Sequence, residues 1–462
     1  MLSDIIAAIS TPKGTGGIAV IRISGEGALS LASRVFFPKS KKNILDYPPR
    51  HAIFGDIADS SSSIDSGILT YFKAPASFTG EDMVEISCHG GYIVSSMVLK
   101  AVLDEGARMA EGGEFTRRAF INDKITLTSA EAIGNMLTAE SEGAVRLSSK
   151  HISGALSEKL NAINTKLTAL VSTLFASIDY PEEDLEDMGD DELVLKITEI
   201  IDDCRALEDT YRSGHAVAHG INTVIIGKPN VGKSSFFNTL LGDRKAIVTD
   251  IPGTTRDIIS ETVEIDGVAL RIFDTAGIRE KTEDTIEKIG VSMAREKLSS
   301  PDTELILALF DLSRELESED EELLEILKSE KTTKTVVPIF TKADKSPVLD
   351  TSKIEDALGA GKRISSESGE GIEEIKKHIT KEFITSPLAL REGAVITSAR
   401  QLSVMKKTRE LLERSRELID ASMKDMALLE LESALSVIGE IDKRSVSERI
   451  VNEIFSKFCV GK

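Results

Sequence analysis

The period of the hydrophobic positions changes three times along the chain. Residues 17–25 (GIAVIRISG) form an apolar run between glycines, which predicts a buried strand in an N-terminal region of short strands and glycine turns. From about Thr126 the pattern becomes helical, and Thr128 with Glu131 predicts a capping box at the start of the first helix. Apolar side chains then recur every three or four residues, at Leu156, Leu160, Ile163, Leu167, Leu170 and Leu174. This stripe predicts a helix that packs against other helices.

A second region of alternating pattern follows an acidic segment. Residues 181–192 contain eight acidic side chains with a proline and a glycine, which predicts an exposed connector between helices. Short apolar runs then predict strands at residues 222–226, 260–265, 268–273, 304–311, 335–340 and 362–365. Asp266 and Gly267 lie between two of these runs, and this pair is typical of a type I′ hairpin turn. Helical periodicity returns from about residue 398.

These patterns predict a multidomain protein of the α+β and α/β classes. The helical pattern stands on both sides of the second alternating region, so the simplest architecture inserts an α/β domain into a helical bundle. We expect an N-terminal α+β domain over residues 1–124 and an inserted domain over residues 217–387. The helical domain then comprises residues 125–216 and 388–462.

Charge and cysteine content narrow the function classes. The net charge of −20 argues against a non-specific grip on nucleic acid. Residues 1–124 are nearly neutral, with 13 Lys and Arg against 14 Asp and Glu, so an anionic ligand meets least repulsion there. Cys88, Cys204 and Cys459 lie far apart, which predicts neither a disulfide framework nor a zinc site. No apolar run is long enough to span a membrane, and we expect a cytoplasmic protein.

The most specific motif is a phosphate-binding loop. Residues 227–234 (GKPNVGKS) fit the pattern GxxxxGK[ST] between an apolar run and a helical run. In such a loop, backbone amides and a helix N-terminus cradle phosphate oxygens, Lys233 neutralises phosphate charge and Ser234 binds Mg²⁺. The predicted nucleotide contacts in this loop are Asn230, Val231, Gly232, Lys233, Ser234 and Ser235.

Four further elements predict a Ras-like P-loop GTPase domain. Thr254 and Thr255 fall where a first switch is expected, and Thr255 is a candidate Mg²⁺ ligand. Asp344 offers two acceptors to guanine, although Thr341 replaces the usual Asn of this motif. The hydroxyl of Thr341 can still make one hydrogen bond, so we expect the site to remain specific for guanine but to bind it with altered affinity. The remaining predicted contacts are Thr249, Asp274, Thr275, Ala276, Gly277, Lys342, Ser365 and Ser366.

Hydrolysis needs a group that this GTPase pattern does not supply. Ile278 stands where Ras-like proteins carry a water-orienting Gln, and isoleucine cannot hold water. Asn230 and residues 249–254 could bind a monovalent cation at the position of an arginine finger. The alternative is that Asn230 is an ordinary variable position of the loop.

The whole chain from Ile18 to Lys462 resembles the tRNA modification GTPase family called MnmE or TrmE. The resemblance rests on IRISG at 21–25, SFTGEDMVEISCHGG at 77–91, GEFTRRAFINDKITL at 113–127 and the C-terminal FCVGK. It implies a potassium-activated GTPase with Mg²⁺ on Ser234 and Thr255. It places the potassium ligands at Asn230, Thr249, Ile251 and Thr254. The general acid/base would be Glu287, which is otherwise an exposed helix glutamate if the loop register differs.

The resemblance also implies a folate site in the N-terminal domain. The ligand would be formyl- or methylene-tetrahydrofolate, bound by Arg22, Glu85, Lys124 and Lys462. A pterin ring offers donors to Glu85, and the glutamate tail needs cations such as Arg22 and Lys124. Cys459 is the family's tail cysteine, and it acts as a nucleophile or acid or serves only in packing.

Family membership further implies the reaction and the partners. A homodimer joined by its N-terminal domains would work with an FAD protein of the MnmG or GidA type as a heterotetramer. Together they would add a carboxymethylaminomethyl-type group to C5 of the wobble uridine of tRNA, using GTP. The alternatives are a regulatory GTPase of ribosome assembly and a stand-alone folate aminomethyltransferase. The folate block and the FCVGK tail argue against the first, and the GTPase domain argues against the second.

Overall fold

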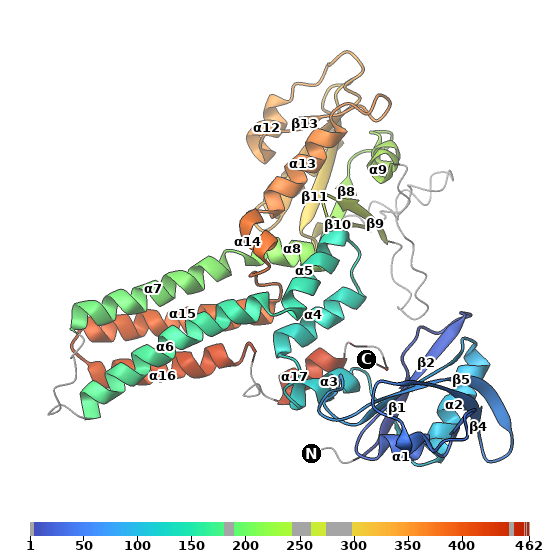
Figure 1. Cartoon of the computed structure of the whole chain (residues 1–462). Coiled ribbons are helices and arrows are strands. Elements are labelled where there is room, and N and C mark those ends of the chain that lie inside the picture. Colours follow the sequence, from blue (N-terminus) through green and yellow to red (C-terminus); the bar gives the residue numbers. More distant parts are fainter. Residues whose placement is uncertain are drawn as a thin grey trace. The chain divides into compact units, whose positions relative to one another are not determined.

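The computed structural model describes residues 4–179, 189–242, 260–273, 298–442, 448–456, 458 and 460–461 (Figure 1). The chain divides into two compact units. One comprises Met1–Gly134, Ile152–Leu193 and Arg414–Lys462. The other comprises Asn135–His151 and Val194–Glu413. Each unit is described by itself.

The first unit contains a sheet that has seven strands among its described residues. The strands are β1 (Ile6–Ile9), β2 (Ile18–Ser24), β3 (Phe36–Pro38), β4 (Ala52–Ala58), β5 (Ser63–Phe72), β6 (Met83–His89) and β7 (Arg108–Met109). Their order is β3-β4-β5-β6-β2-β1-β7, and every pair is antiparallel except β1 with β7. A 3₁₀ turn, η1, spans Ile44–Asp46.

The two faces of this sheet differ in character. The helices α1 (Ala28–Ala32) and α2 (Tyr92–Asp104) contribute to one apolar core with Ile21 and Ile86 of the sheet. Because side chains alternate along a strand, Arg22 and Glu85 project from the opposite face. The predicted strand at 17–25 is therefore confirmed as β2, but only one of its faces is fully buried.

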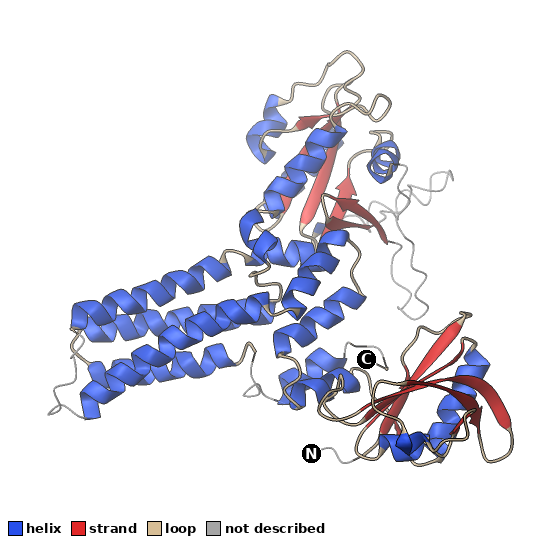
Figure 2. Ribbon diagram, in the orientation of Figure 1, coloured by secondary structure: helices blue, strands red, loops and turns tan. Residues whose placement is uncertain are grey.

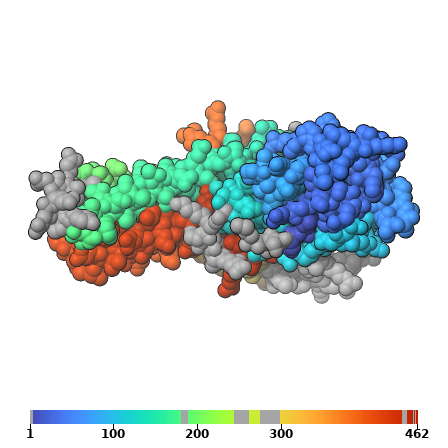
Figure 3. All heavy atoms as spheres, turned by 60° about the horizontal axis from the view of Figure 1, so that its bottom comes forward, coloured from blue at the N-terminus to red at the C-terminus, as the bar shows by residue number. Residues whose placement is uncertain are grey.

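Among the residues that the structure describes, five further helices belong wholly or mainly to the first unit. They are α3 (Glu114–Ile121), α4 (Leu127–Leu137), α6 (Ala155–Asp179), α16 (Lys424–Gly439) and α17 (Glu448–Ser456). The predicted leucine stripe is confirmed, since all six of its side chains are buried on α6. That helix packs along α16, and Figure 3 shows the two segments in green and red.

The predicted capping box at Thr128 is wrong. Helix α4 begins at Leu127, and the backbone N–H of Ser129 donates to Oγ1 of Thr126 at 3.2 Å. Thr126 therefore caps the helix. Thr128 is buried in the first turn, where its hydroxyl donates to Asp442 Oδ1 at 2.7 Å.

The predicted acidic connector is too long. Helix α7 (Asp190–Glu208) begins with Asp190, Asp191 and Glu192, so the last three residues of the predicted connector are helical. Acidic side chains are favoured in a first helical turn because they complement the helix dipole. Residues 181–188 lie outside the described residues.

The second unit contains a mainly parallel sheet, with six strands among its described residues. The strands are β8 (Ile221–Ile226), β9 (Ser260–Ile265), β10 (Val268–Phe273), β11 (Leu305–Asp311), β12 (Thr335–Thr341) and β13 (Lys362–Arg363). Their order is β13-β12-β11-β8-β10-β9, and only β9 runs antiparallel to its neighbour. The six predicted strands are confirmed to within two residues. The hairpin turn is confirmed too, with left-handed φ at Asp266 (50°) and Gly267 (83°).

Helices cover both faces of this sheet (Figure 2). Successive residues of β11 alternate between two apolar clusters, with Leu307 in one and Ile306 in the other. The first cluster includes α9 and α13, and the second includes α11 and α12. This arrangement confirms the predicted α/β domain and shows that its sheet is doubly wound. The helices in the described part of this unit are α5 (Glu142–Ile152), α7, α8 (Tyr211–His219), α9 (Lys233–Leu241), α11 (Ser318–Glu330), α12 (Ser352–Leu358), α13 (Ile372–Phe383), α14 (Pro387–Glu392) and α15 (Ala399–Asp420).

Candidate functional site

The phosphate-binding loop connects β8 to α9 at the point where the strand order reverses. Strand β8 has β11 on one side and β10 on the other, and ligands of such sheets bind at the carboxyl ends of the strands at this position. Gly227 is required because a Cβ there would lie 2.6 Å from the carbonyl oxygen of Leu309. Gly232 has φ 104° and precedes α9, so the backbone of the loop is shaped for phosphate.

The structure describes the surroundings of the predicted contacts in this loop. The Lys233 ammonium donates to the carbonyl oxygens of Gly227 and Lys228, both at 2.8 Å, across the mouth of the loop. Asn230 is exposed with left-handed φ of 60°. Val231 is buried, whereas Ser234 and Ser235 lie in the first turn of α9. The two hydrogen bonds of the Lys233 ammonium thus help to hold the loop in its curved form.

The predicted base-binding motif lies beside this loop. Thr341 ends β12 and is buried, and its hydroxyl donates to the carbonyl oxygen of Val231 at 2.7 Å. Phe310 O lies 3.2 Å from the same hydroxyl as a second acceptor. The single proton of Thr341 therefore ties the base-binding motif to the phosphate-binding loop.

Asp344 and Ser365 also come together, as the predicted guanine site requires. A hydrogen bond from the Ser365 hydroxyl lowers the pKa of the Asp344 carboxyl, which keeps it an acceptor. Ser365 is fully buried, and the Ala343 N–H donates to the carbonyl oxygen of Ile364 at 3.0 Å. The hydroxyl of Thr239 in α9 donates to the carbonyl oxygen of Ser235 at 2.7 Å, and the carbonyl oxygen of Ser366 lies 3.4 Å from it as a second acceptor.

Two lysines beside these loops form ion pairs that were not predicted. The Lys228 ammonium, nearly buried, lies 2.6 Å from Glu317 and 3.0 Å from Asp320 at the start of α11. The Lys342 ammonium lies 2.5 Å from Asp311, whose carboxylate is also nearly buried. Sequence reasoning missed both partners because Asp311 and Glu317 lie outside every motif, and only the position of Asp311 at the end of a buried strand marks it.

The other predicted contacts of this site are not described. They are Thr249, Ile251, Thr254, Thr255, Asp274, Thr275, Ala276, Gly277 and Glu287, and all lie outside the described residues.

A second candidate site lies on the polar face of the N-terminal sheet. Arg22 and Glu85 are cross-strand partners on β2 and β6. Nε and Nη2 of Arg22 donate to Oε1 of Glu85 at 3.0 Å and 2.7 Å. The guanidinium carbon of Arg22 also lies 5.6 Å from the ring centre of Phe78 and 5.7 Å from that of Phe115. The pair is therefore fixed before any ligand binds.

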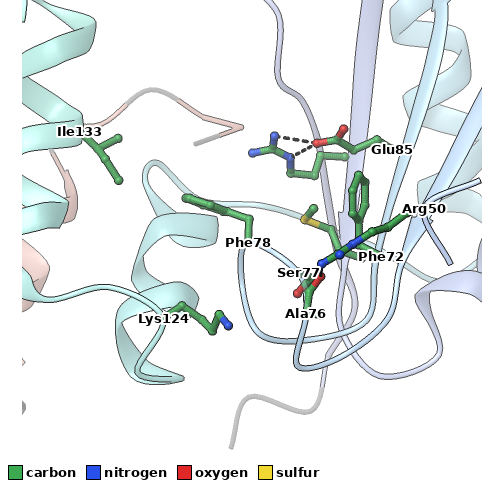
Figure 4. A pocket seen from close by; sticks show the side chains of 10 residues that line it. Arg50, Phe72, Ala76, Ser77, Phe78, Glu85, Lys124 and Ile133 are labelled. Carbon is green, nitrogen blue, oxygen red and sulfur yellow. Dashed lines mark hydrogen bonds and ion pairs between the residues drawn. The ribbon is translucent and has the colours of Figure 1, made fainter. Parts of the chain in front are cut away.

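Arg22 and Glu85 line a cavity of about 700 Å³ (Figure 4). Its walls are largely apolar, as small-molecule pockets are. Lys124 lines the same cavity, so the structure brings together three of the four predicted folate contacts. The fourth, Lys462, and the tail Cys459 lie outside the described residues. The other lining residues are Arg50, Phe72, Ala76, Ser77, Phe78, Met83 and Ile133.

The two described cysteines are unsuited to chemistry. Burial raises the pKa of the Cys88 thiol to about 11 and that of Cys204 to about 12, and both are free. Within the described ranges, no group of three or more His, Cys, Asp or Glu side chains is arranged to hold a metal. Nor does any helix there have the length and apolar character needed to cross a membrane.

The doubly wound sheet, its phosphate-binding loop and the adjoining base-binding motif define a P-loop nucleotide-binding protein of the GTPase class. A family model described as the GTP-binding protein TrmE N-terminus matches residues 5–124, and one described as the MnmE helical domain matches residues 127–459. The chain therefore belongs to the MnmE family of tRNA modification GTPases. This membership confirms the resemblance and the expected class of enzyme.

Relatives of known name are similar in sequence to this chain over their whole length. The tRNA modification GTPase MnmE of Clostridioides difficile strain 630 is 40% identical over 464 residues, covering 100% of both chains. That of Thermoanaerobacter pseudethanolicus is 39% identical over 467 residues with the same coverage. Among solved structures, the G domain of the T. maritima FeoB iron transporter is 30% identical, with a TM-score of 0.27. The match covers 35% of this chain and 97% of that one.

Proposed function

We propose that this chain is a potassium-activated GTPase that modifies the wobble uridine of tRNA at C5 together with a flavoprotein partner. The product carries a carboxymethylaminomethyl-type group. The observation that carries the proposal is the cavity lined by Arg22, Glu85 and Lys124, which occurs in the same chain as the phosphate-binding loop. A GTPase that acts only as a regulatory switch has no need of that cavity.

In the nucleotide site, we assign guanine recognition to Asp344 and Ser365, with phosphate contacts from residues 230–235. Ser234 and Thr255 would hold Mg²⁺, since hydroxyl oxygens suit this hard cation. Asn230, Thr249, Ile251 and Thr254 would hold K⁺ through oxygen atoms. Bound there, K⁺ supplies positive charge beside the transferred phosphoryl group, where Ras-like enzymes use an arginine.

The remaining assignments in this site follow the family pattern. Asp274, Thr275, Ala276 and Gly277 would contact Mg²⁺ and the γ-phosphate. Glu287 would act as the general acid/base, because Ile278 cannot orient water. Thr341 serves the site indirectly, through its bond to Val231 O.

In the N-terminal cavity, we assign a formyl- or methylene-tetrahydrofolate. Glu85 would accept hydrogen bonds from the donor edge of the pterin ring. Arg22, which we expected from the sequence to bind the glutamate tail, is instead assigned to orient that carboxylate, because it donates two hydrogen bonds to Glu85. Lys124 and Lys462 would contribute positive charge, and Cys459 is a candidate nucleophile or acid. The apolar walls suit a flat ring, and the cavity volume is in the range of small-molecule sites.

We further propose a cytoplasmic homodimer joined through its N-terminal domains. It would bind the flavoprotein as a heterotetramer and act on tRNA. The domain boundaries at residues 124, 216 and 387 belong to this proposal. Closure of the two GTPase domains on each other would accompany GTP hydrolysis.

The test is the nucleoside composition of tRNA from a strain that lacks this protein. Mass spectrometry of digested tRNA should show loss of the C5-substituted wobble uridines and their return when the gene is restored. Unchanged wobble uridines together with a defect in ribosomal subunits would favour the ribosome-assembly alternative instead.

A further inference from the structure

We infer that Arg50 binds the carboxylates of the folate's glutamate tail. The tail would lie in the part of the N-terminal cavity where the Arg50 guanidinium contacts Ala76. This inference rests on the proposed folate function and adds a residue that sets the specificity of that site. It is carried by the charges, hydrogen bonds and backbone geometry of the residues that line the cavity.

The charges of the cavity do not balance. Its ionisable lining residues are Arg22, Arg50, Glu85 and Lys124. Arg22 is committed to Glu85 through two hydrogen bonds, so these two charges cancel. In the part of the chain that the structure describes, neither Arg50 nor Lys124 has a carboxylate partner. The cavity therefore holds two uncompensated positive charges, which match the two carboxylates of a glutamate tail.

Arg50 is positioned before any ligand arrives. Its backbone has left-handed φ of 62°, and its N–H donates to the carbonyl oxygen of Tyr71 at 2.7 Å. One guanidinium nitrogen, Nη2, donates to the neutral carbonyl oxygen of Ala76 at 3.0 Å. The other donors remain for a ligand, and the fork of a guanidinium matches a carboxylate.

Lys124 is positioned in a different way. A Cβ on Gly80, which has φ of 77°, would lie 3.2 Å from Cγ of Lys124 and 3.3 Å from its Cδ. The absence of a side chain at Gly80 thus leaves room for the stem of Lys124. Figure 4 shows Arg50 beside Ala76 and Ser77, and Lys124 on a separate segment, away from Glu85. A ligand whose donor edge binds Glu85 can therefore place its anionic tail near Arg50 and Lys124.

The test compares two ligands that differ only in the tail. One is 5-formyltetrahydrofolate, and the other is the 5-formyl-tetrahydropterin that lacks the aminobenzoylglutamate. Both are titrated into the full-length wild type, Arg50→Gln and Lys73→Gln, the last being an exposed cation nearby that does not line the cavity. Arg50→Gln should weaken the folate by about 10- to 100-fold, the effect of losing charge-assisted hydrogen bonds, and leave the tailless pterin unchanged. Lys73→Gln should change neither.

Arg50→Lys gives a second readout, because it keeps the charge but loses the fork. It should bind the folate more tightly than Arg50→Gln and less tightly than the wild type. Equal weakening of both ligands in Arg50→Gln, or no weakening of either, would overturn the role of Arg50 while leaving the folate site standing. Failure of the wild type to bind the folate at all would overturn the folate site itself, and this inference with it.

Discussion

Two lysines fix the nucleotide-binding loops through carboxylates that no motif contains. Burial lowers the pKa of Lys228, but the hydrogen bonds from its ammonium to Glu317 and Asp320 outweigh this effect and raise it overall. Burial alone would raise the pKa of Asp311, but the hydrogen bonds from Lys342 and Ser313 outweigh burial and lower this pKa overall. A nearly buried charge of this kind is costly when its partner is removed. These pairs therefore hold the loops in one conformation.

At Asp344, the change to Asn should switch base preference from guanine toward xanthine. The carboxylate offers two acceptors, whereas the amide offers one acceptor and one donor. Competition binding with GDP and XDP measures the preference, and Glu325→Gln on the exposed face of α11 is the control. Unchanged GTP turnover in Asp344→Asn would remove this residue from the base-binding role.

His151 should make the unit that carries the GTPase site acid-sensitive. Burial lowers its pKa from 6.5 to about 4, against opposing hydrogen bonds with the backbone of Gly393 and Val395. The folded state therefore binds this proton more weakly than the unfolded state, and stability falls as pH drops from about 6.5 toward about 4. At pH 5 the loss is about 2 kcal/mol.

The comparison for His151 is between the wild type and His151→Gln, which cannot take up the proton. Thermal unfolding of both from pH 7.5 to pH 5 should show the wild-type Tm falling more steeply. Parallel pH profiles of the two proteins would show that His151 is not the group that titrates.

At the scale of elements, the β9–β10 hairpin packs closely against α5. A Cβ on Gly143 of α5 would lie 2.1 Å from the carbonyl oxygen of Gly267 at the hairpin turn. Glu140 also pairs with Arg271 of β10 at 2.6 Å. The hairpin begins directly after residue 259 and ends directly before Asp274, so it joins the two segments that carry the predicted switch residues.

Gly143→Ala should therefore destabilise the protein, although alanine favours a helix over glycine. The added methyl meets a backbone atom that cannot move cheaply, and overpacking of this kind costs about 1–3 kcal/mol. Thermal unfolding measures the effect, with Gly17→Ala as the control because its added methyl meets nothing within 4 Å. A Tm for Gly143→Ala at or above that of the wild type would show that the contact gives way.

Elements with strong local signals were predictable, and contacts across the fold were not. Strands β9 and β10 follow from apolar runs on either side of an Asp-Gly turn. The start of α4 was missed because several hydroxyl residues stand together, and Thr128 is bound by Asp442, 314 positions away in sequence. The role of Arg50 was also missed, because nothing in the neighbouring sequence distinguishes it from a surface arginine.

For the whole molecule, hydrolysis should depend on the monovalent cation. K⁺ sheds water more readily than Na⁺ and needs a wider cage of oxygens, so GTP hydrolysis should be much faster in K⁺. Steady-state rates at equal ionic strength in KCl and NaCl measure this dependence. Equal rates in both salts would remove the potassium role proposed for Asn230 and residues 249–254.

The central claim is that the phosphate-binding loop and the N-terminal cavity serve one reaction. The most direct measurement is the content of C5-substituted wobble uridine in tRNA from a strain whose only copy is a variant. Lys233→Ala and Glu85→Gln should each fail to restore the nucleoside, although both accumulate to the wild-type level. Lys353→Gln, at an exposed site on α12, should restore it fully. Full restoration by Glu85→Gln would contradict the account, because the cavity would then have no part in the modification.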